Sequence, residues 1–169
     1  RDLHWCENSS CGKTGEFGYD LLVERGRFDV VKDALMELGA PLDIAWISTE
    51  TLEQCALESW FFNIRREGRA EVTPLELQLQ WRVSYAKEYV GAAALRERRA
   101  AGAQQRLTCL VGASPIAVDD EVRLGDEVVG RILNAGRSSI RGDWVASALL
   151  RRDCAHAGLD VLSVAGAAG

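Results

Sequence analysis

The sequence predicts an α+β protein, in which a mixed helix-and-strand part is followed by a part made of short strands. Over the first hundred residues, apolar side chains recur at helical spacing or alternate as along strands. After Gly102 the texture changes to short β-type runs separated by turn residues, which is typical of a small barrel or sandwich. We therefore expect a first domain over residues 1–90, and a helix with a small C-terminal β-barrel over residues 91–169.

The first part is predicted to contain a strand and two helices. Apolar side chains alternate along residues 17–24, and residues 27–38 carry an apolar stripe at helical spacing that Gly39 is well placed to end. A second helix is expected to open at Ser48 or Thr49, because a hydroxyl there can accept hydrogen bonds from free N–H groups.

The middle of the chain is expected to be a polar loop over residues 63–72. The segment that follows leaves two structures open: Thr73 and Pro74 suit the first turn of a short helix, while Leu75, Leu77 and Leu79 alternate as in a strand. Residues 92–101 are rich in strong helix formers. The later strands are expected at residues 106–111, 121–124, 127–133, 144–150 and 159–164, with Leu124-Gly125-Asp126 as a hairpin turn.

Composition narrows the classes of partner and location. The net charge of −5 and the pI of about 5.1 argue against nucleic acid or an anionic membrane as partner. No apolar run approaches the roughly 18 residues that a membrane span needs. The five cysteines lack CxxC spacing, which predicts reduced thiols, no metal site and a cytoplasmic protein. Because the chain begins at Arg1 without Met, we interpret it as a fragment or a processed piece.

Familiar catalytic motifs are missing from the sequence. Cys11-Gly12-Lys13-Thr14 is similar to the end of a phosphate-binding loop, but Glu7 stands where that loop needs a glycine. There is no GxSxG elbow, and the only histidines are His4 and His156. The residues by themselves therefore indicate a globular protein without a complete active site.

The most distinctive run is Thr14-Gly15-Glu16-Phe17-Gly18-Tyr19-Asp20, which places two glycines and two carboxylates where an alternating strand begins. Glycine lets the backbone turn sharply or pass close to a ligand, and acids beside such a turn can accept hydrogen bonds from N–H donors. The run thus predicts a ligand-binding turn.

This run resembles the signature Tyr-Thr-Gly-Glu-x-Gly-Tyr-Glu of the aminomethyltransferase family, the folate-dependent T-protein of glycine cleavage and its relatives. Further resemblances follow in the same order and cover nearly the whole chain. The family's Ala-Arg-Asp-Thr-Leu helix is resembled by Ser48-Thr49-Glu50-Thr51-Leu52, and its Thr-Pro-x-Glu…Trp segment by Thr73-Pro74-Leu75-Glu76 with Trp81. Its Lys-x-Phe-Ile-Gly-x-x-Ala-Leu run is resembled by Lys87-Glu88-Tyr89-Val90-Gly91 with Ala94-Leu95. Its C-terminal barrel is resembled by the module from Arg106 through Val129-Gly130 and Gly136.

The resemblance implies a tetrahydrofolate-binding enzyme that moves a one-carbon unit from a donor to folate. Asp20 would hydrogen-bond the pterin ring, because a carboxylate can accept two N–H bonds from an aminopyrimidinone edge. Trp81 would pack its face against the cofactor. Glu16, Tyr19 and Thr49 complete the folate site that the resemblance implies.

Three positions depart from the family pattern. Lys13 replaces the signature's first tyrosine, Asp20 replaces a glutamate and so withdraws its oxygens by about 1 Å, and Thr49 replaces an arginine. The family's catalytic aspartate lies in the N-terminal half, and neither Asp2 nor Glu7 has the context to replace it. The catalytic residue is therefore unknown, and the chain alone is expected to be inactive.

The leading hypothesis is the C-terminal portion of a folate-dependent one-carbon transferase, which we interpret as an O-, S- or N-demethylase. Its expected partners are folate, a small methyl donor, and the N-terminal half of the same enzyme or a second chain. One alternative is a non-enzymatic relative that binds folate or maintains iron–sulfur clusters. That branch carries Lys-Gly-Cys-Tyr-x-Gly-Gln-Glu near Ser59 to Arg66, and this chain has neither its cysteine nor its glycines there. A third is a structural subunit that uses exposed apolar surface.

Overall fold

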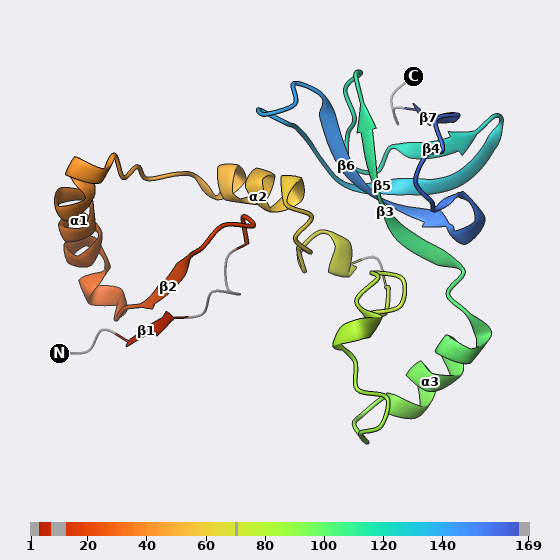
Figure 1. Ribbon diagram of the computed structural model, residues 1–169, viewed down its shortest axis with the longest axis horizontal. Coiled ribbons are helices and arrows are strands. Elements are labelled where there is room, and N and C mark those ends of the chain that lie inside the picture. Colours follow the sequence, from red (N-terminus) through yellow and green to blue (C-terminus); the bar gives the residue numbers. More distant parts are fainter. Residues whose placement is uncertain (1–3, 8–12, 70, 166–169) are drawn as a thin grey trace. The chain divides into compact units, whose positions relative to one another are not determined.

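The computed structural model describes residues 4–7, 13–69 and 71–165, and the chain packs as two compact units, Arg1–Phe61 and Phe62–Gly169 (Figure 1). These are called the first and second unit below. The units are a division by packing, so the predicted domains over residues 1–90 and 91–169 stay a prediction. The two units differ sharply in how much apolar surface each one buries by itself.

The first unit contains one pair of strands and two helices. Strand β1 (His4–Glu7) pairs with β2 (Tyr19–Leu22) in antiparallel register, so β2 is shorter than the expected strand. Helix α1 (Phe28–Gly39) lies between the short 3₁₀ turns Arg25–Arg27 and Ala40–Leu42. Gly39 is the last residue of α1, so the helix ends at the glycine that was expected to end it.

Helix α2 (Thr49–Glu58) begins where the sequence indicated. Of the two expected caps, the structure selects Ser48, whose Oγ accepts a hydrogen bond from the Thr51 N–H at 3.2 Å. Ala56 and Leu57 are its buried residues, whereas Trp60 is exposed because it lies beyond the end of the helix.

The second unit opens with turns and continues into helix α3 (Ala92–Ala101), which has the predicted bounds. Short 3₁₀ turns occupy Glu67–Arg69 and Gln80–Arg82. Between them, the segment from Thr73 is neither of the two structures that the sequence left open. It forms consecutive turns in which the Leu77 N–H donates to the Thr73 carbonyl at 3.2 Å.

A five-stranded antiparallel sheet makes up the rest of the second unit (Figure 1). Its strands are β3 (Gln105–Gly112), β4 (Glu121–Leu124), β5 (Glu127–Arg137), β6 (Trp144–Arg151) and β7 (Leu162–Ala165), in the spatial order β3-β6-β5-β4-β7. Leu124 pairs with Glu127, so Gly125 and Asp126 form the predicted hairpin turn, and Gly125 has a φ of 60°. Among the described strands β3 and β7 are unpaired edges, so the sheet is open and the predicted closed barrel is not confirmed.

Strand β6 lies near the middle of this sheet and is buried on both faces. Neighbouring residues of a strand point to opposite faces, and Leu149 and Leu150 accordingly enter two different apolar clusters. Leu150 packs with Val122 and Ile132 in the larger cluster, and Leu149 packs with Leu107 and Leu133 in the smaller one. The second unit therefore has a core of its own.

Gly130 lies where two strands come too close for a side chain. A Cβ at this position would lie 2.3 Å from the carbonyl oxygen of Leu149, which is backbone and cannot turn aside. We expect Gly130→Ala to lower the free energy of unfolding of the second unit by about 2–3 kcal/mol, measured by urea denaturation. Gly112→Ala is the matched control, because a Cβ there would make only an ordinary contact at 3.5 Å with Ile116. Equal stability of the two variants would contradict this account of Gly130.

Candidate functional site

The run Thr14–Asp20 of the first unit, called the acidic turn below, is held against the end of α2. Gly15 has a φ of 80°, a conformation that favours glycine, and a Cβ there would lie 3.0 Å from the Ser59 Cβ. The Ser59 hydroxyl donates a hydrogen bond to the Lys13 carbonyl at 3.1 Å. The expected sharp turn is confirmed, and the close approach that its glycine permits is to the protein itself.

The acidic side chains of this turn are exposed. Asp20 is in β2, and its carboxylate has no hydrogen bond or ion pair within the part of the chain that the structure describes. Tyr19 is also exposed and meets the Phe17 ring edge to face, with centroids 5.2 Å apart. Because successive strand residues point to opposite faces, a ligand lying on one face of β2 meets either Tyr19 or Asp20, not both.

The remaining predicted site residues lie on two different units. Glu16 is exposed in the turn, and Thr49 is exposed as the first residue of α2. Trp81 belongs to the second unit, where 70% of its surface is exposed and the Arg82 guanidinium lies 4.6 Å from its ring centroid. A common folate site formed by these residues and Asp20 therefore stays a prediction.

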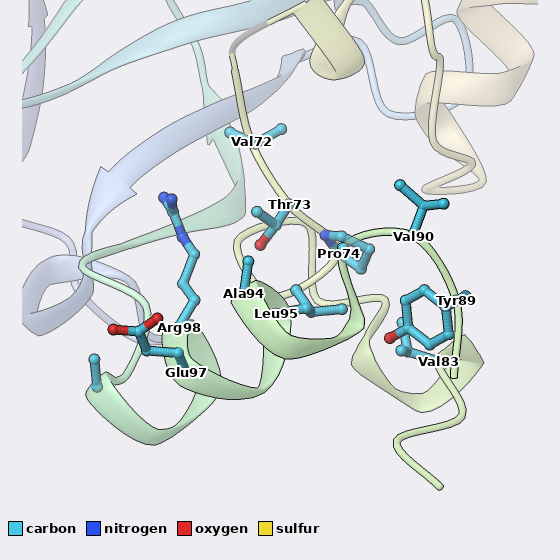
Figure 2. Close-up of a pocket in the computed structure, with 12 residues that line it drawn as sticks. Val72, Thr73, Pro74, Val83, Tyr89, Val90, Ala94, Leu95, Glu97 and Arg98 are labelled. Atoms are coloured by element: carbon cyan, nitrogen blue, oxygen red, sulfur yellow. The ribbon is translucent and has the colours of Figure 1, made fainter. Parts of the chain in front are cut away.

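A pocket of about 720 Å³ lies within the second unit, between α3, residues 72–74 and the loop before α3 (Figure 2). Its walls are mostly apolar, and Arg98 and Glu97 are its charged members. The predicted site residues do not line it. The sequence analysis did not predict this pocket. Its walls nevertheless include Thr73, Pro74 and residues of the run from Tyr89 to Leu95, which all belong to segments that resemble the aminomethyltransferase family.

A buried carboxylate, Glu76, holds the walls of the pocket together. One of its oxygens accepts hydrogen bonds from the backbone N–H (2.8 Å) and the hydroxyl of Thr73, and the other accepts from the Arg98 Nε at 2.9 Å. Its backbone carbonyl accepts from the Leu107 N–H at 2.7 Å, which ties the turn to β3. Burial raises the pKa of Glu76, but the hydrogen bonds from Thr73 and Arg98 together outweigh burial and hold the pKa below its ordinary value.

Arginines of α3 hold the preceding loop in place. Arg96 donates to the carbonyl oxygens of Tyr85 (3.1 Å) and Lys87 (3.0 Å) and to the Glu88 carboxylate (2.7 Å). The Arg99 guanidinium lies 4.0 Å from the centroid of the Tyr85 ring. This loop, which forms one wall of the pocket, is thus fixed to the helix that forms another.

Three exposed carboxylates outside the acidic turn have lowered pKa values. A backbone N–H lowers the pKa of Glu50, and the guanidinium groups of Arg96 and Arg151 lower those of Glu88 and Asp153. Such carboxylates are ionised at neutral pH and can accept hydrogen bonds from N–H donors.

In residues 4–7, 13–69 and 71–165 there is no group of three or more His, Cys, Asp or Glu side chains placed to hold a metal ion. None of the helices described is both long and apolar enough to cross a membrane.

Sequence comparison identifies similar proteins. A family profile described as the GCVT N-terminal domain matches residues 4–87. An aminomethyltransferase of Thermotoga sp. (strain RQ2) is 28% identical over 145 residues, which cover 85% of this chain and 40% of that protein. The mitochondrial dimethylglycine dehydrogenase of Homo sapiens is 30% identical over 118 residues, which cover 69% of this chain and 13% of that protein. The chain thus spans about 40% of the length of the aminomethyltransferase it matches.

Comparison of structures gives a likeness of fold. The crystal structure of the glycine cleavage system aminomethyltransferase T from Bartonella henselae superposes with a TM-score of 0.74 at 17% sequence identity. The superposition covers 85% of this chain and 41% of that one. The profile match includes the acidic turn, α2 and Glu76, and it ends shortly before α3.

The pKa of Glu76 makes the stability of the second unit depend on pH. Because the folded-state pKa lies below the ordinary value of 4.5, the Glu76 carboxylate stabilises the folded state above that value, and the contribution is lost as the pH falls through the folded pKa. We expect Glu76→Gln to lower the free energy of unfolding by about 2 kcal/mol at pH 7, with a smaller difference from wild type below pH 4.5. Urea denaturation at several pH values measures this difference. Glu97→Gln, which changes a neighbouring exposed carboxylate, should stay close to wild type throughout; a pH-independent effect of Glu76→Gln would show that the carboxylate charge does not matter.

Proposed function

Since the chain belongs to the aminomethyltransferase family, we propose that it is a portion of a tetrahydrofolate-dependent transferase that moves a methyl or aminomethyl group to folate. The observation that carries the proposal is the acidic turn. It lies inside the stretch that the family profile matches, it is fixed to α2 through Gly15 and Ser59, and it presents Asp20 to solvent with no partner in the described chain. A fixed turn with a free carboxylate suits recognition of a ligand's N–H donors.

The pterin edge is the part of folate that Asp20 would bind. An ionised carboxylate can accept two parallel N–H bonds from an aminopyrimidinone, and such charge-assisted bonds are stronger than neutral ones. Asp20 is one methylene shorter than the glutamate of the family signature, so the ligand must approach β2 about 1 Å more closely. Glu16, Thr49 and Trp81 are exposed, which leaves each of them accessible to a cofactor.

The donor is proposed to be a small methylated compound, which makes the whole protein a demethylase of O-, S- or N-methyl groups. One of the relatives is named for dimethylglycine, an amine that carries two methyl groups, and this favours an N-methyl donor. The catalytic acid is proposed to lie in the part of the transferase that this chain does not include, so the chain alone would bind weakly and catalyse no transfer. A cytoplasmic location is part of the same proposal.

A non-enzymatic, folate-binding relative is the second candidate function. It would bind folate through the same acidic turn, so folate binding by itself does not separate the two candidates. Transfer of a labelled methyl group to tetrahydrofolate, measured with the complete protein, separates them: product formation favours the transferase, and tight binding without product favours the binding protein.

Isothermal titration calorimetry with tetrahydrofolate tests the role of Asp20, using this chain combined with the remaining part of the transferase. Losing a charge-assisted pair of hydrogen bonds costs about 1.5–3 kcal/mol, so Asp20→Ala should weaken binding by roughly 10- to 100-fold. Asp20→Glu restores the family's side-chain length and should bind at least as tightly as wild type. Glu24→Ala removes a nearby exposed acid beyond the end of β2 and is the matched control. Equal affinity of Asp20→Ala and Glu24→Ala would sink the assignment of Asp20.

A further inference from the structure

The pocket beside α3 has apolar walls and one polar end. Figure 2 shows Arg98 and Glu97 at the end formed by the C-terminal half of α3, while Tyr89 lies at the opposite end. Gly91 and Arg98 are about 10 Å apart along the helix axis, from the rise per residue of an α-helix. The volume of about 720 Å³ is typical of small-molecule sites, which are mostly apolar with a few polar groups. The pocket therefore suits a ligand that has a polar head and an apolar body.

Arg98 offers hydrogen-bond donors that are already oriented. Its Nε donates to the Glu76 carboxylate at 2.9 Å, and within the described part of the chain its two Nη groups make no hydrogen bond. The Arg98 side chain is 52% exposed, so a ligand can reach it. A guanidinium is planar, and holding its Nε therefore limits the directions in which the Nη groups point. Such a group can accommodate a ligand carboxylate at a small cost in side-chain entropy.

The second charged group of the pocket is Glu97, which is exposed. Its carboxylate has no hydrogen bond or ion pair within residues 4–7, 13–69 and 71–165. Successive residues of a helix do not face each other, so Glu97 and Arg98 both line the pocket without pairing with each other. Glu97 is therefore available to accept hydrogen bonds from a ligand ammonium group.

The charges of the pocket select the head group of the ligand. Glu76 compensates the charge of Arg98, so Glu97 leaves these three side chains with a net negative charge. Glu97 would repel a ligand that carries only a carboxylate, and a ligand that carries only an ammonium group would leave the Arg98 Nη groups without an acceptor. A zwitterion pairs with both side chains and adds no net charge. An α-amino acid is such a zwitterion, because its ammonium and carboxylate groups are attached to one carbon atom.

We propose that the pocket binds a free α-amino acid with an apolar side chain, whose carboxylate accepts from the Arg98 Nη groups and whose ammonium group donates to Glu97. The apolar side chain of the ligand lies between α3 and Pro74 and extends toward Tyr89. An aromatic side chain fits best, because its ring can contact the Tyr89 ring. The predicted folate-site residues do not line this pocket, so the proposal does not depend on the proposed function.

Titration of the isotope-labelled chain with L-phenylalanine, followed by NMR spectroscopy of the backbone amides, tests the proposal. The amide signals of residues 89–98 should shift, while those of β5 and β6 should stay in place. Phenethylamine lacks the carboxylate and phenylpropanoate lacks the ammonium group, so each should bind at least threefold more weakly than L-phenylalanine. Equal affinity of the three compounds would reveal an apolar contact alone and overturn the assignment of the head group.

Two alanines of α3 provide a matched pair of variants. Ala93 and Ala94 are both exposed, and of the two Ala94 lines the pocket. Ala94→Trp fills the pocket and leaves the hydrogen bonds of Glu76 in place, so it should weaken the binding of L-phenylalanine at least tenfold. Ala93→Trp adds the same side chain outside the pocket and should change the affinity less than twofold. The same affinity in both variants would show that the ligand binds elsewhere.

Glu97→Gln tests the charge on the protein side. It should weaken the binding of L-phenylalanine and phenethylamine at least threefold without weakening that of phenylpropanoate, and misfolding would instead affect all three compounds. An unchanged affinity for L-phenylalanine in Glu97→Gln would contradict the role of Glu97.

Two further titrations test whether the site is separate and open. L-phenylalanine should bind equally well in the presence of saturating tetrahydrofolate, and it should bind to the complete protein as it does to this chain. Displacement by tetrahydrofolate would assign the pocket to the folate site, and loss of binding in the complete protein would show that another segment fills the pocket. Either result would overturn the proposal, whereas the Asp20 titration bears on the proposed function alone.

Discussion

Glu76 joins three segments of the second unit, and the pocket there depends on it. The Glu76 carboxylate accepts hydrogen bonds from Thr73 and Arg98, and the backbone carbonyl of Glu76 accepts one from the Leu107 N–H. A buried carboxylate is costly without partners and strongly directional with them, so the turn, α3 and the start of β3 are held in one arrangement. The pocket walls are therefore positioned by a charged group that is 2% exposed and does not itself line the pocket.

The sequence was most informative where local chemistry decides the structure. The bounds of α3 follow from its helix-forming composition, and the β4–β5 turn follows from Gly125 and Asp126. It was least informative where a distant partner decides. The segment from Thr73 could not be resolved between helix and strand, because its turns are stabilised by Arg98, a residue of α3 that no local pattern connects to Glu76. Closure of a sheet is likewise a property of pairing between its edges, which alternation along each strand does not encode.

The sequence was sufficient to single out the residues of the acidic turn, but it did not predict their mutual geometry. The glycines and acids of residues 14–20 are a local pattern, and Gly15 does occupy a glycine conformation. That its neighbour across the turn is Ser59 depends on the path of the chain through both helices. The opposite directions of Tyr19 and Asp20 could have been read from the strand period alone, and they limit how many members of a predicted cluster one ligand can reach.

The contact between Gly15 and Ser59 has a consequence for how this region can change in evolution. Ser59 directly follows α2, where its N–H donates to the Cys55 carbonyl and its hydroxyl donates to the Lys13 carbonyl. The acidic turn is thereby positioned by the residue that directly follows the end of α2. An insertion or deletion inside α2 would rotate and shift that end by a fraction of a turn, and the turn bearing the acids would have to move with it. The length of α2 is thus under the same constraint as the acids, although α2 contributes only Thr49 to the predicted site.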